Sequence, residues 1–277
     1  TLPKHQTNGD AMSKTFVLGV GAQKAGTSWL YKQVSHHPGF KKGWTKEYHI
    51  WDVREVSVLR SGKRKLRNSL SPKRLDMYLM EKFPSRYFAH FKHLLSSEHS
   101  LACDISPSYC ALSPETLLQI KQGMARNQIE FKCLFIMRDP VDRCLSAFNM
   151  IRNRSNGREI VSMSPDEDMA FMQYVKSEHA KIRTEYELTL AALRTSLTPE
   201  DYRILIYEEM FTTAHLDALQ AYLGFSFSQK SASEKVFANE YNTSISQQAK
   251  AFCRKHFTPT YDAVARDFPQ VKTLWAH

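Results

Sequence analysis

A loop with two glycines, 21-GAQKAGTSWL-30, follows a short apolar run and leads into a segment with helical character. Glycines let the backbone approach an anion closely, and the N–H groups at a helix start add partial positive charge. Lys24 supplies a full charge, and Thr27 and Ser28 supply hydroxyl donors. The loop predicts a phosphate site, with a plain turn between strand and helix as the alternative. In the standard nucleotide P-loop the lysine follows the second glycine, whereas Lys24 precedes Gly26.

A second candidate for anion binding follows the apolar run 131-FKCLFIM-137. Arg138 comes directly after this run, and Ser146 lies eight residues further on, in a segment expected to be helical. A guanidinium group is a fixed, charged fork that suits a phosphate dianion, and a serine hydroxyl adds a donor. The alternative is that Arg138 only pairs with a nearby carboxylate such as Asp142.

The elements that must position these residues alternate between strands and helices. Buried strands are predicted at 15–20, 131–137 and 202–207, with a strand that runs into a turn at 99–110. Helices are predicted over 27–38, 113–123, 138–153, 164–197, 208–224 and 247–268, the last with a break near Pro259. This alternation predicts an α/β fold with a central parallel sheet flanked by helices. We expect one domain over 15–277, preceded by a polar, flexible leader over 1–14.

Local signals set one expected end of each of three helices. Thr27 or Ser28 is expected to cap the helix that follows the glycine loop. Ser113 and Pro114 are expected to open the next one. Gly224 is suited to the left-handed residue that ends the helix at 208–224.

The composition indicates a folded domain that binds anions. Of the 277 residues, 42% are hydrophobic and 12% aromatic, which supports a packed core and excludes disorder throughout. The formal net charge is +10, which favours nucleic acid, membrane phosphates, acidic sugars or a phosphorylated cofactor without choosing among them. Residues 60–74 hold seven basic and no acidic residues. We weigh a solvated surface loop there against a mobile flap that attracts an anionic acceptor.

The cysteines and the apolar runs bear on the compartment. The five cysteines are an odd number without a CxxC pair, so we expect reduced, structural thiols and a cytoplasmic protein. No apolar run has the length that a membrane-spanning helix needs, so we expect no integral membrane segment. We find no plausible cluster of metal ligands and expect no metal.

The first two motifs together resemble those of the sulfotransferases that use 3′-phosphoadenosine 5′-phosphosulfate (PAPS). The glycine loop is similar to that family's 5′-phosphosulfate loop, G-x-Q-K-[AST]-G-T-[ST]-x-L. Arg138 and Ser146 match the pair that binds the 3′-phosphate in that family. The resemblance covers about residues 15–225 and implies a P-loop-like sulfotransferase fold with PAPS as the sulfuryl donor and no metal. It implies the following cofactor-binding residues: Lys24, Ala25, Gly26, Thr27, Ser28, Trp29, Arg138 and Ser146.

A third motif, 46-KEYHIWD-52, is similar to a segment of the carbohydrate-modifying branch, which includes the heparan sulfate enzymes. That likeness implies that Glu47 is the general base, supported by His49 and Asp52, with Lys24 acting on the leaving oxygen. The alternative is that Glu47 merely pairs on the surface with Lys46 or Lys42. The resemblance also implies a hydroxyl-bearing acceptor, a carbohydrate, a glycolipid or another small alcohol, and a bacterial member of the family.

The sequence departs from the carbohydrate-modifying branch in two places. One concerns acceptor binding, and the other concerns the segment that closes over the cofactor. Heparan-modifying enzymes carry a lysine just before a Thr-Pro-x-Tyr turn, but here Ile105 precedes the similar turn 106-SPSY-109. Those enzymes also carry a late basic hairpin over the cofactor, and 238–250 is the candidate replacement.

Two other functions compete with sulfuryl transfer. A P-loop kinase would use ATP and Mg²⁺, with Asp139 after the second apolar strand as a metal ligand. A basic protein that binds nucleic acid or a membrane surface would explain the charge but would leave Glu47 and the glycine loop unused. We expect the sulfotransferase, and therefore no nucleic-acid partner.

Overall fold

Four parallel strands form the central sheet, in the order β2-β1-β3-β4. Their bounds are β1 Thr15–Gly21, β2 Leu101–Ile105, β3 Glu130–Met137 and β4 Tyr202–Ile206. The computed structural model describes residues 13–62, 64–65, 71–95, 98–153, 166–227 and 244–276. Every residue of β1 and β2 is buried, as expected for strands that are covered on both faces.

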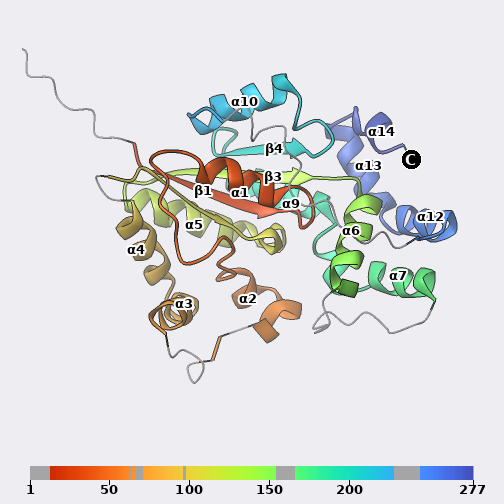
Figure 1. The fold of residues 1–277 in the computed structure, drawn as a ribbon, viewed down its shortest axis with the longest axis horizontal. Coiled ribbons are helices and arrows are strands. Elements are labelled where there is room, and N and C mark those ends of the chain that lie inside the picture. Colours follow the sequence, from red (N-terminus) through yellow and green to blue (C-terminus); the bar gives the residue numbers. More distant parts are fainter. Residues whose placement is uncertain are drawn as a thin grey trace, which may run out of the picture.

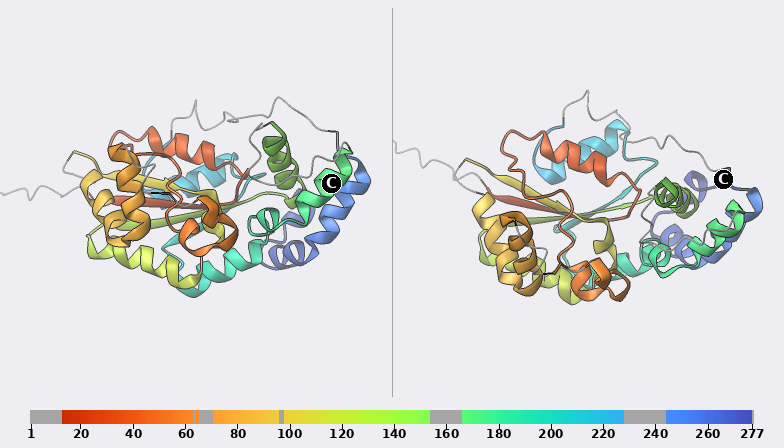
Figure 2. Two further views of the ribbon diagram at one scale, coloured as in Figure 1. Left: turned by 90° about the horizontal axis from the view of Figure 1, so that it is seen from below. Right: turned by 60° about the horizontal axis from the view of Figure 1, so that its bottom comes forward.

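Helices cover both faces of the sheet. The helices before β3 are α1 Thr27–Ser35, α2 Asp52–Glu55, α3 Pro72–Lys82, α4 Pro84–Leu94 and α5 Pro114–Arg126, with 3₁₀ segments η1 Ser57–Gly62 and η3 Pro107–Ala111. Those after it are α6 Pro140–Asn153, α7 Glu167–Val175, α8 Glu178–Lys181, α9 Tyr186–Ser196, α10 Thr213–Leu223, α12 Gln247–His256, α13 Thr258–Asp267 and α14 Val271–Leu274. Helices α1 and α10 lie on one face, and α5 and α9 lie on the other (Figures 1 and 2). The predicted α/β fold is confirmed.

A smaller apolar core lies beside the sheet, between α6, α7 and α12 (Figure 1). Phe148 of α6 packs edge to face on Phe171 of α7, with ring centroids 5.6 Å apart. Cys253 of α12 is fully buried in the same cluster. This packing fixes α6, the helix that carries Ser146, against the C-terminal helices.

Several predicted helices differ from the observed ones. The region predicted as one helix to Leu197 is three helices, α7, α8 and α9, while 164–165 lie outside the described residues. Ser177 interrupts it, because its Oγ accepts a hydrogen bond from the Ala180 backbone and starts α8 anew. The helix predicted from residue 208 begins at Thr213, because 207–212 form a tight turn after β4. Gly224 does end α10 in the left-handed conformation, with φ of 80°.

The helices α3 and α4 were not predicted at all. They are held by aromatic side chains that reach the sheet from α4: Phe91 packs on Phe16 of β1 with centroids 4.5 Å apart, and Tyr87 packs on the same ring. Such contacts join residues far apart in the sequence, so they leave no local signal beyond an amphipathic pattern.

A buried carboxylate closes the end of β2. Asp104 is fully buried, and its Oδ1 accepts hydrogen bonds from the Tyr48 backbone N–H at 3.2 Å and from Ser106 Oγ at 2.6 Å. Its Oδ2 accepts from the hydroxyls of Tyr87 and Tyr109 at 2.9 and 2.8 Å. Burial raises the pKa of Asp104 to about 6, although the hydrogen bonds from Ser106 and Tyr109 oppose that shift.

The same network fixes a stretch of chain that has no regular secondary structure. The backbone N–H of His49 donates to Ser106 Oγ at 3.2 Å, and that of Ile50 donates to the Tyr109 hydroxyl at 3.1 Å. Together with the bond from Tyr48, three successive N–H groups are therefore held by the carboxylate and the two hydroxyls that it orients. Segment 46–50 is thereby fixed beside the C-terminal edge of the sheet.

We expect Asp104→Ala to lower the free energy of unfolding by at least about 3 kcal/mol. The substitution leaves four buried donors without their acceptor, and each such loss costs about 1–3 kcal/mol. Urea unfolding followed by circular dichroism measures the change, with Asp262→Ala, an exposed aspartate of α13, as the control. Equal urea midpoints for the two variants would contradict this role of Asp104.

Candidate active site

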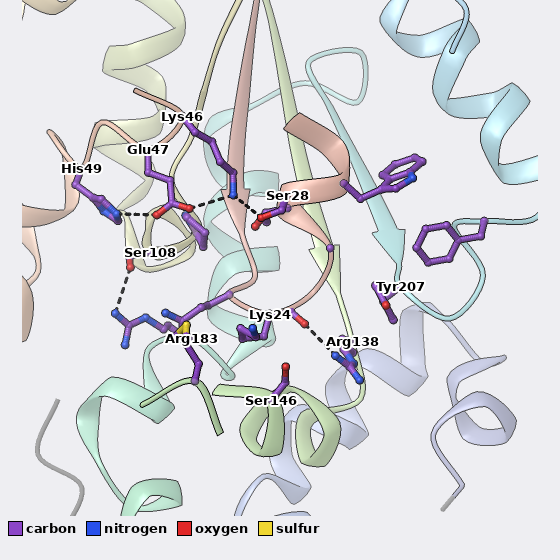
Figure 3. A pocket seen from close by; sticks show the side chains of 17 residues that line it. Lys24, Ser28, Lys46, Glu47, His49, Ser108, Arg138, Ser146, Arg183 and Tyr207 are labelled. Carbon is purple, nitrogen blue, oxygen red and sulfur yellow. Dashed lines mark hydrogen bonds and ion pairs between the residues drawn. The ribbon is translucent and has the colours of Figure 1, made fainter. Parts of the chain in front are cut away.

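A cavity of about 460 Å³ opens at the C-terminal edge of the sheet (Figure 3). In parallel sheets this edge collects the loops that follow the strands, so residues from distant parts of the sequence meet there. The lining residues are Gln23, Lys24, Gly26, Thr27, Ser28, Trp29, Lys46, Glu47, His49, Pro107, Ser108, Arg138, Ser146, Met150, Arg183, Tyr207 and Phe211. The three sequence motifs therefore border one cavity.

The glycine loop turns sharply between β1 and α1. Lys24 has φ of 66° and Gly26 has φ of 92°, both in the left-handed region that non-glycine residues rarely adopt. The N-cap of α1 is Gly26, so the prediction that Thr27 or Ser28 caps this helix is wrong. Because capping does not use those hydroxyls, they line the cavity together with the positive end of α1. Ala25, one of the predicted cofactor-binding residues, is fully buried and is not among the residues that line the cavity.

Arg138 lies at the end of the cavity that is formed by β3, α6 and the turn after β4. Its guanidinium donates to the Lys24 carbonyl oxygen at 3.2 Å and to Asp142 Oδ2 at 3.2 Å. It also lies over the ring of Tyr207, 4.8 Å from the centroid. The pairing with Asp142 anticipated from the sequence is present, but that carboxylate is 47% exposed, and such pairs are weak. An anion in the cavity can therefore compete for the guanidinium, next to Ser146.

An aromatic wall continues from Tyr207. Phe211 packs edge to face on Tyr207 and on Trp29, with ring centroids 5.4 and 5.5 Å away. All three side chains line the cavity. Phe211 was predicted to lie in a helix and Tyr207 at the end of the strand 202–207, but both lie in the turn after β4, so their part in the cavity was missed. A planar aromatic ligand would find stacking surface on this side.

Three residues of the cavity wall, Lys46, Glu47 and His49, form a chain of contacts that ends at the buried Asp52. Lys46 Nζ lies 3.0 Å from Ser28 Oγ and 3.0 Å from Glu47 Oε1. His49 Nε2 lies 3.2 Å from Glu47 Oε2, and His49 Nδ1 lies 2.6 Å from Asp52 Oδ2. The pairing of Glu47 with Lys46 is thus present, but inside the cavity and not on an open surface.

These contacts raise the pKa of His49 and lower the pKa of Glu47. For His49, burial disfavours the charged form, but hydrogen bonds to Asp52 and Glu47 outweigh it and raise the pKa to about 10. For Glu47, burial favours the neutral form, but the hydrogen bond from His49 and the charge of Lys46 outweigh it and lower the pKa to about 2. At neutral pH Glu47 is therefore an ionised carboxylate held between two cations.

Two residues that the sequence singled out lie outside this cavity, and a third predicted segment is only partly described. Asp139 does not line the cavity: its Oδ1 accepts from the first backbone N–H groups of α6, and its Oδ2 accepts from the Tyr261 hydroxyl at 3.0 Å. Ile105 is fully buried in the core. Of the candidate hairpin replacement, 238–243 lie outside the described residues.

The basic stretch 60–74 is only partly described, since residues 63 and 66–70 fall outside. Within it, Arg64 pairs with Glu81 and donates to the Tyr48 carbonyl oxygen at 2.9 Å.

No described helix is long and apolar enough to cross a membrane. Within the described residues, no group of three or more His, Cys, Asp and Glu side chains is arranged to hold a metal.

The two shifted pKa values make stability depend on pH in opposite directions. His49 gains a proton more readily in the folded chain, so its contribution is complete below pH 6.5 and is lost as the pH rises toward 10. Glu47 contributes above pH 4.5, and this contribution is lost as the pH falls toward 2. We expect the stability difference between wild type and His49→Asn to be largest near pH 6 and to shrink up to pH 10. Asparagine suits this position because it tolerates the φ of 51° found at His49.

Urea midpoints of both proteins at pH 5 to 10 measure this difference. The exposed His215→Asn of α10 is the control for the general effect of replacing an imidazole by an amide. A constant difference between wild type and His49→Asn would contradict the ion-paired state of His49.

Comparison with known proteins gives matches among solved structures only. No protein-family model matches the chain, and no curated protein sequence matches it. A sulfotransferase from Alicyclobacillus acidocaldarius is similar, with a TM-score of 0.58 and 19% identity over 96% of this chain and 100% of that one.

Two weaker matches are sulfotransferase domains. One comes from the Synechococcus PCC 7002 olefin synthase, with a TM-score of 0.48, 15% identity and coverage of 96% of this chain and 98% of that one. The other comes from the curacin biosynthetic pathway, with a TM-score of 0.43, 16% identity and coverage of 79% and 76%. Both TM-scores lie below 0.5, so the fold assignment uses the Alicyclobacillus structure alone. The chain has the fold of that solved sulfotransferase.

Proposed function

We propose that the chain transfers the sulfuryl group of PAPS to a hydroxyl of an acceptor molecule, with Glu47 as the general base. The observation that supports this most is the shared cavity of two anion-binding features and one carboxylate: the loop with Lys24, the pair Arg138 and Ser146, and Glu47. Sulfuryl transfer needs this set, because a charged donor must be held while a nearby base takes the acceptor proton.

The residues around Arg138 suit the nucleotide part of the donor. Arg138 and Ser146 would bind the 3′-phosphate, since a guanidinium and a hydroxyl are its natural partners. Trp29, Tyr207 and Phe211 offer aromatic surface to the adenine ring. Every one of these side chains comes from an element that the sheet or the α6 core holds in place.

The residues around Lys24 suit the phosphosulfate. Thr27, Ser28 and the positive end of α1 would bind the 5′-phosphate. Lys24 would lie at the bridging oxygen, where negative charge grows as the bond from sulfur to that oxygen breaks. The leaving group is 3′,5′-bisphosphoadenosine (PAP). No metal is needed in this assignment, because the lysine and the helix end supply the positive charge.

Glu47 would take the proton of the acceptor hydroxyl while its oxygen forms the new bond to sulfur. A carboxylate with a pKa near 2 is a weak base, so its environment must change when substrates bind. Lys46 provides such a change, since its ammonium is shared between Ser28 and Glu47. A donor phosphosulfate at Ser28 would attract Lys46 away from Glu47 and raise the pKa of that carboxyl. His49, which is already protonated and is held by Asp52, would orient Glu47 through the contact between Nε2 and Oε2.

We also propose the finer assignments that the third motif implies. The Glu47 and His49 pair supports placement in the carbohydrate-modifying branch, with a carbohydrate, glycolipid or other small alcohol as acceptor. The cytoplasm is the proposed compartment, because all five cysteines are buried and free. Nothing in the site favours a kinase, since Asp139 caps α6 and lies outside the cavity.

The donor assignment predicts that Lys24→Ala and Arg138→Ala each weaken PAP binding by about 10- to 100-fold. This range corresponds to the loss of one or two charge-assisted hydrogen bonds. Isothermal titration calorimetry measures the affinity. The control is Arg126→Ala, which removes an exposed arginine of α5 and should leave PAP binding unchanged. PAP binding that is the same in all four proteins would exclude the cavity as the donor site.

The base assignment predicts that Glu47→Gln lowers the transfer rate by about 10²- to 10⁴-fold, the usual contribution of a positioned base. PAP affinity should change little, because Glu47 takes no part in donor binding. The rate is measured as radioactive sulfate transferred from labelled PAPS to a panel of sugars and small alcohols. Glu115→Gln, an exposed glutamate at the start of α5, is the matched control. A Glu47→Gln protein with the wild-type rate would remove Glu47 from the mechanism.

A further inference from the structure

Cys144 of α6 lies beside a buried guanidinium. Arg143 is fully buried, and its Nη2 donates to Cys144 Sγ at 3.0 Å and to the Tyr174 hydroxyl at 3.2 Å. Its Nε and Nη1 have no hydrogen-bond partner among the residues that the structure describes. A guanidinium stays protonated, and burying its charge is costly unless an anion lies close to it. Arg143 therefore needs a negative group within the small apolar core.

Cys144 is the group that can supply this negative charge. The strongest electrostatic partners of Arg143 are Cys144, Tyr174 and Tyr186. Burial raises the pKa of both tyrosines, so their hydroxyls stay neutral. Burial also disfavours the Cys144 thiolate, but a hydrogen bond from the Cys253 thiol and the charge of Arg143 outweigh it and lower the pKa of Cys144 to about 6. At neutral pH Cys144 is therefore mainly a thiolate.

A second thiol comes from α12. Cys253 is fully buried in the same apolar cluster as Cys144, and α12 packs against α6 (Figure 1). Its hydrogen bond to the Cys144 sulfur, together with burial, raises the pKa of Cys253, so this thiol keeps its proton. For Cys103, Cys110 and Cys133 burial prevails and raises the pKa. A thiolate in contact with a second thiol is the arrangement from which a disulfide forms.

We propose that Cys144 and Cys253 are a site of reversible oxidation, at which a peroxide joins α6 to α12 through a disulfide and thereby weakens binding of the nucleotide donor. The Cys144 thiolate attacks one oxygen of hydrogen peroxide, the O–O bond breaks, and a sulfenic acid and hydroxide result. The Cys253 sulfur then attacks the oxidised sulfur, the S–S bond forms, and the thiol proton and the sulfenic hydroxyl leave as water. The two sulfurs together lose the two electrons that reduce the peroxide.

The effect on the donor follows from the place of Cys144 on α6. Ser146 lies on the same helix, which begins at Pro140, directly after Arg138 and Asp139. An S–S bond is much shorter than a non-bonded contact between two sulfurs, so oxidation draws α6 toward α12. It also removes the thiolate and leaves a guanidinium charge buried without an anion. Both changes displace the helix that carries Ser146, so the effect on PAP, though not the disulfide, rests on the proposed function.

Peptide mapping tests the bond itself. The folded wild-type protein is treated with a small molar excess of hydrogen peroxide, unfolded in N-ethylmaleimide and digested. We expect one pair of peptides joined through Cys144 and Cys253, which dithiothreitol separates, while Cys103, Cys110 and Cys133 are alkylated. A different pairing, or alkylation of all five cysteines, would overturn the proposal.

Calorimetry with PAP tests the consequence of the bond. We expect the oxidised wild-type protein to bind PAP at least about fivefold more weakly than the reduced protein, and dithiothreitol to restore the affinity. Cys253→Ala removes the second thiol, so peroxide should leave its PAP affinity unchanged. Cys133→Ala, which removes an equally buried thiol from β3, is the matched control and should respond as the wild type does.

The outcomes separate this inference from the proposed function. Failure of the reduced wild-type protein to bind PAP would contradict the proposed function, while peptide mapping would still decide whether the disulfide forms. Unchanged PAP affinity in protein that contains the linked peptides would overturn the effect on the donor. An equal fall in affinity for Cys253→Ala would assign the effect to oxidation of Cys144 alone, and would overturn the role of the disulfide. If Cys253→Ala does not fold, the reduced and oxidised wild-type proteins still decide the proposal.

Discussion

The site depends on one buried carboxylate. Asp104 at the end of β2 accepts four hydrogen bonds and supports the segment that carries Lys46, Glu47 and His49. It holds the backbone N–H of Tyr48 directly, and it orients Ser106 and Tyr109, which hold those of His49 and Ile50. That segment has no helix or strand of its own to fix it. A buried acceptor with several donors is costly to disrupt, which makes it a firm anchor for an irregular stretch. The orientation of the proposed base is therefore a consequence of packing at the sheet edge.

Three positively charged side chains, Arg138, Lys24 and Lys46, occupy successive parts of the cavity. Arg138 is held by a carbonyl oxygen and a half-exposed carboxylate, which an incoming phosphate can replace. Lys24 occupies the middle, on a loop whose left-handed residues direct it there. Lys46 connects the loop to Glu47 through two 3.0 Å contacts. This last connection offers a physical reason why the carboxylate would become an effective base only after the donor has bound.

The sequence was sufficient to predict the parallel α/β fold, because apolar runs alternate with helical segments, and the structure confirms it. The motifs at 21–30, 46–52 and 131–146 also pointed to residues that the structure brings to one cavity. The sequence was insufficient to predict that Arg183, Tyr207 and Phe211 line the cavity. These residues lie outside the three motifs and reach the cavity only through tertiary packing. Helices α3 and α4 were missed for the same reason, since Tyr87 and Phe91 are fixed by contacts with β1.

The central claim is that the cavity recognises a nucleotide with phosphates at both the 3′ and 5′ positions. Thermal unfolding of the wild-type protein with PAP, with 5′-AMP, and with ATP plus Mg²⁺ tests this most directly. A ligand at about 100 times its Kd stabilises a protein by roughly 2.7 kcal/mol, which is a readily measured shift. The account predicts clear stabilisation by PAP and much smaller shifts with the other two nucleotides. Stabilisation by ATP plus Mg²⁺ alone would contradict it and favour a kinase.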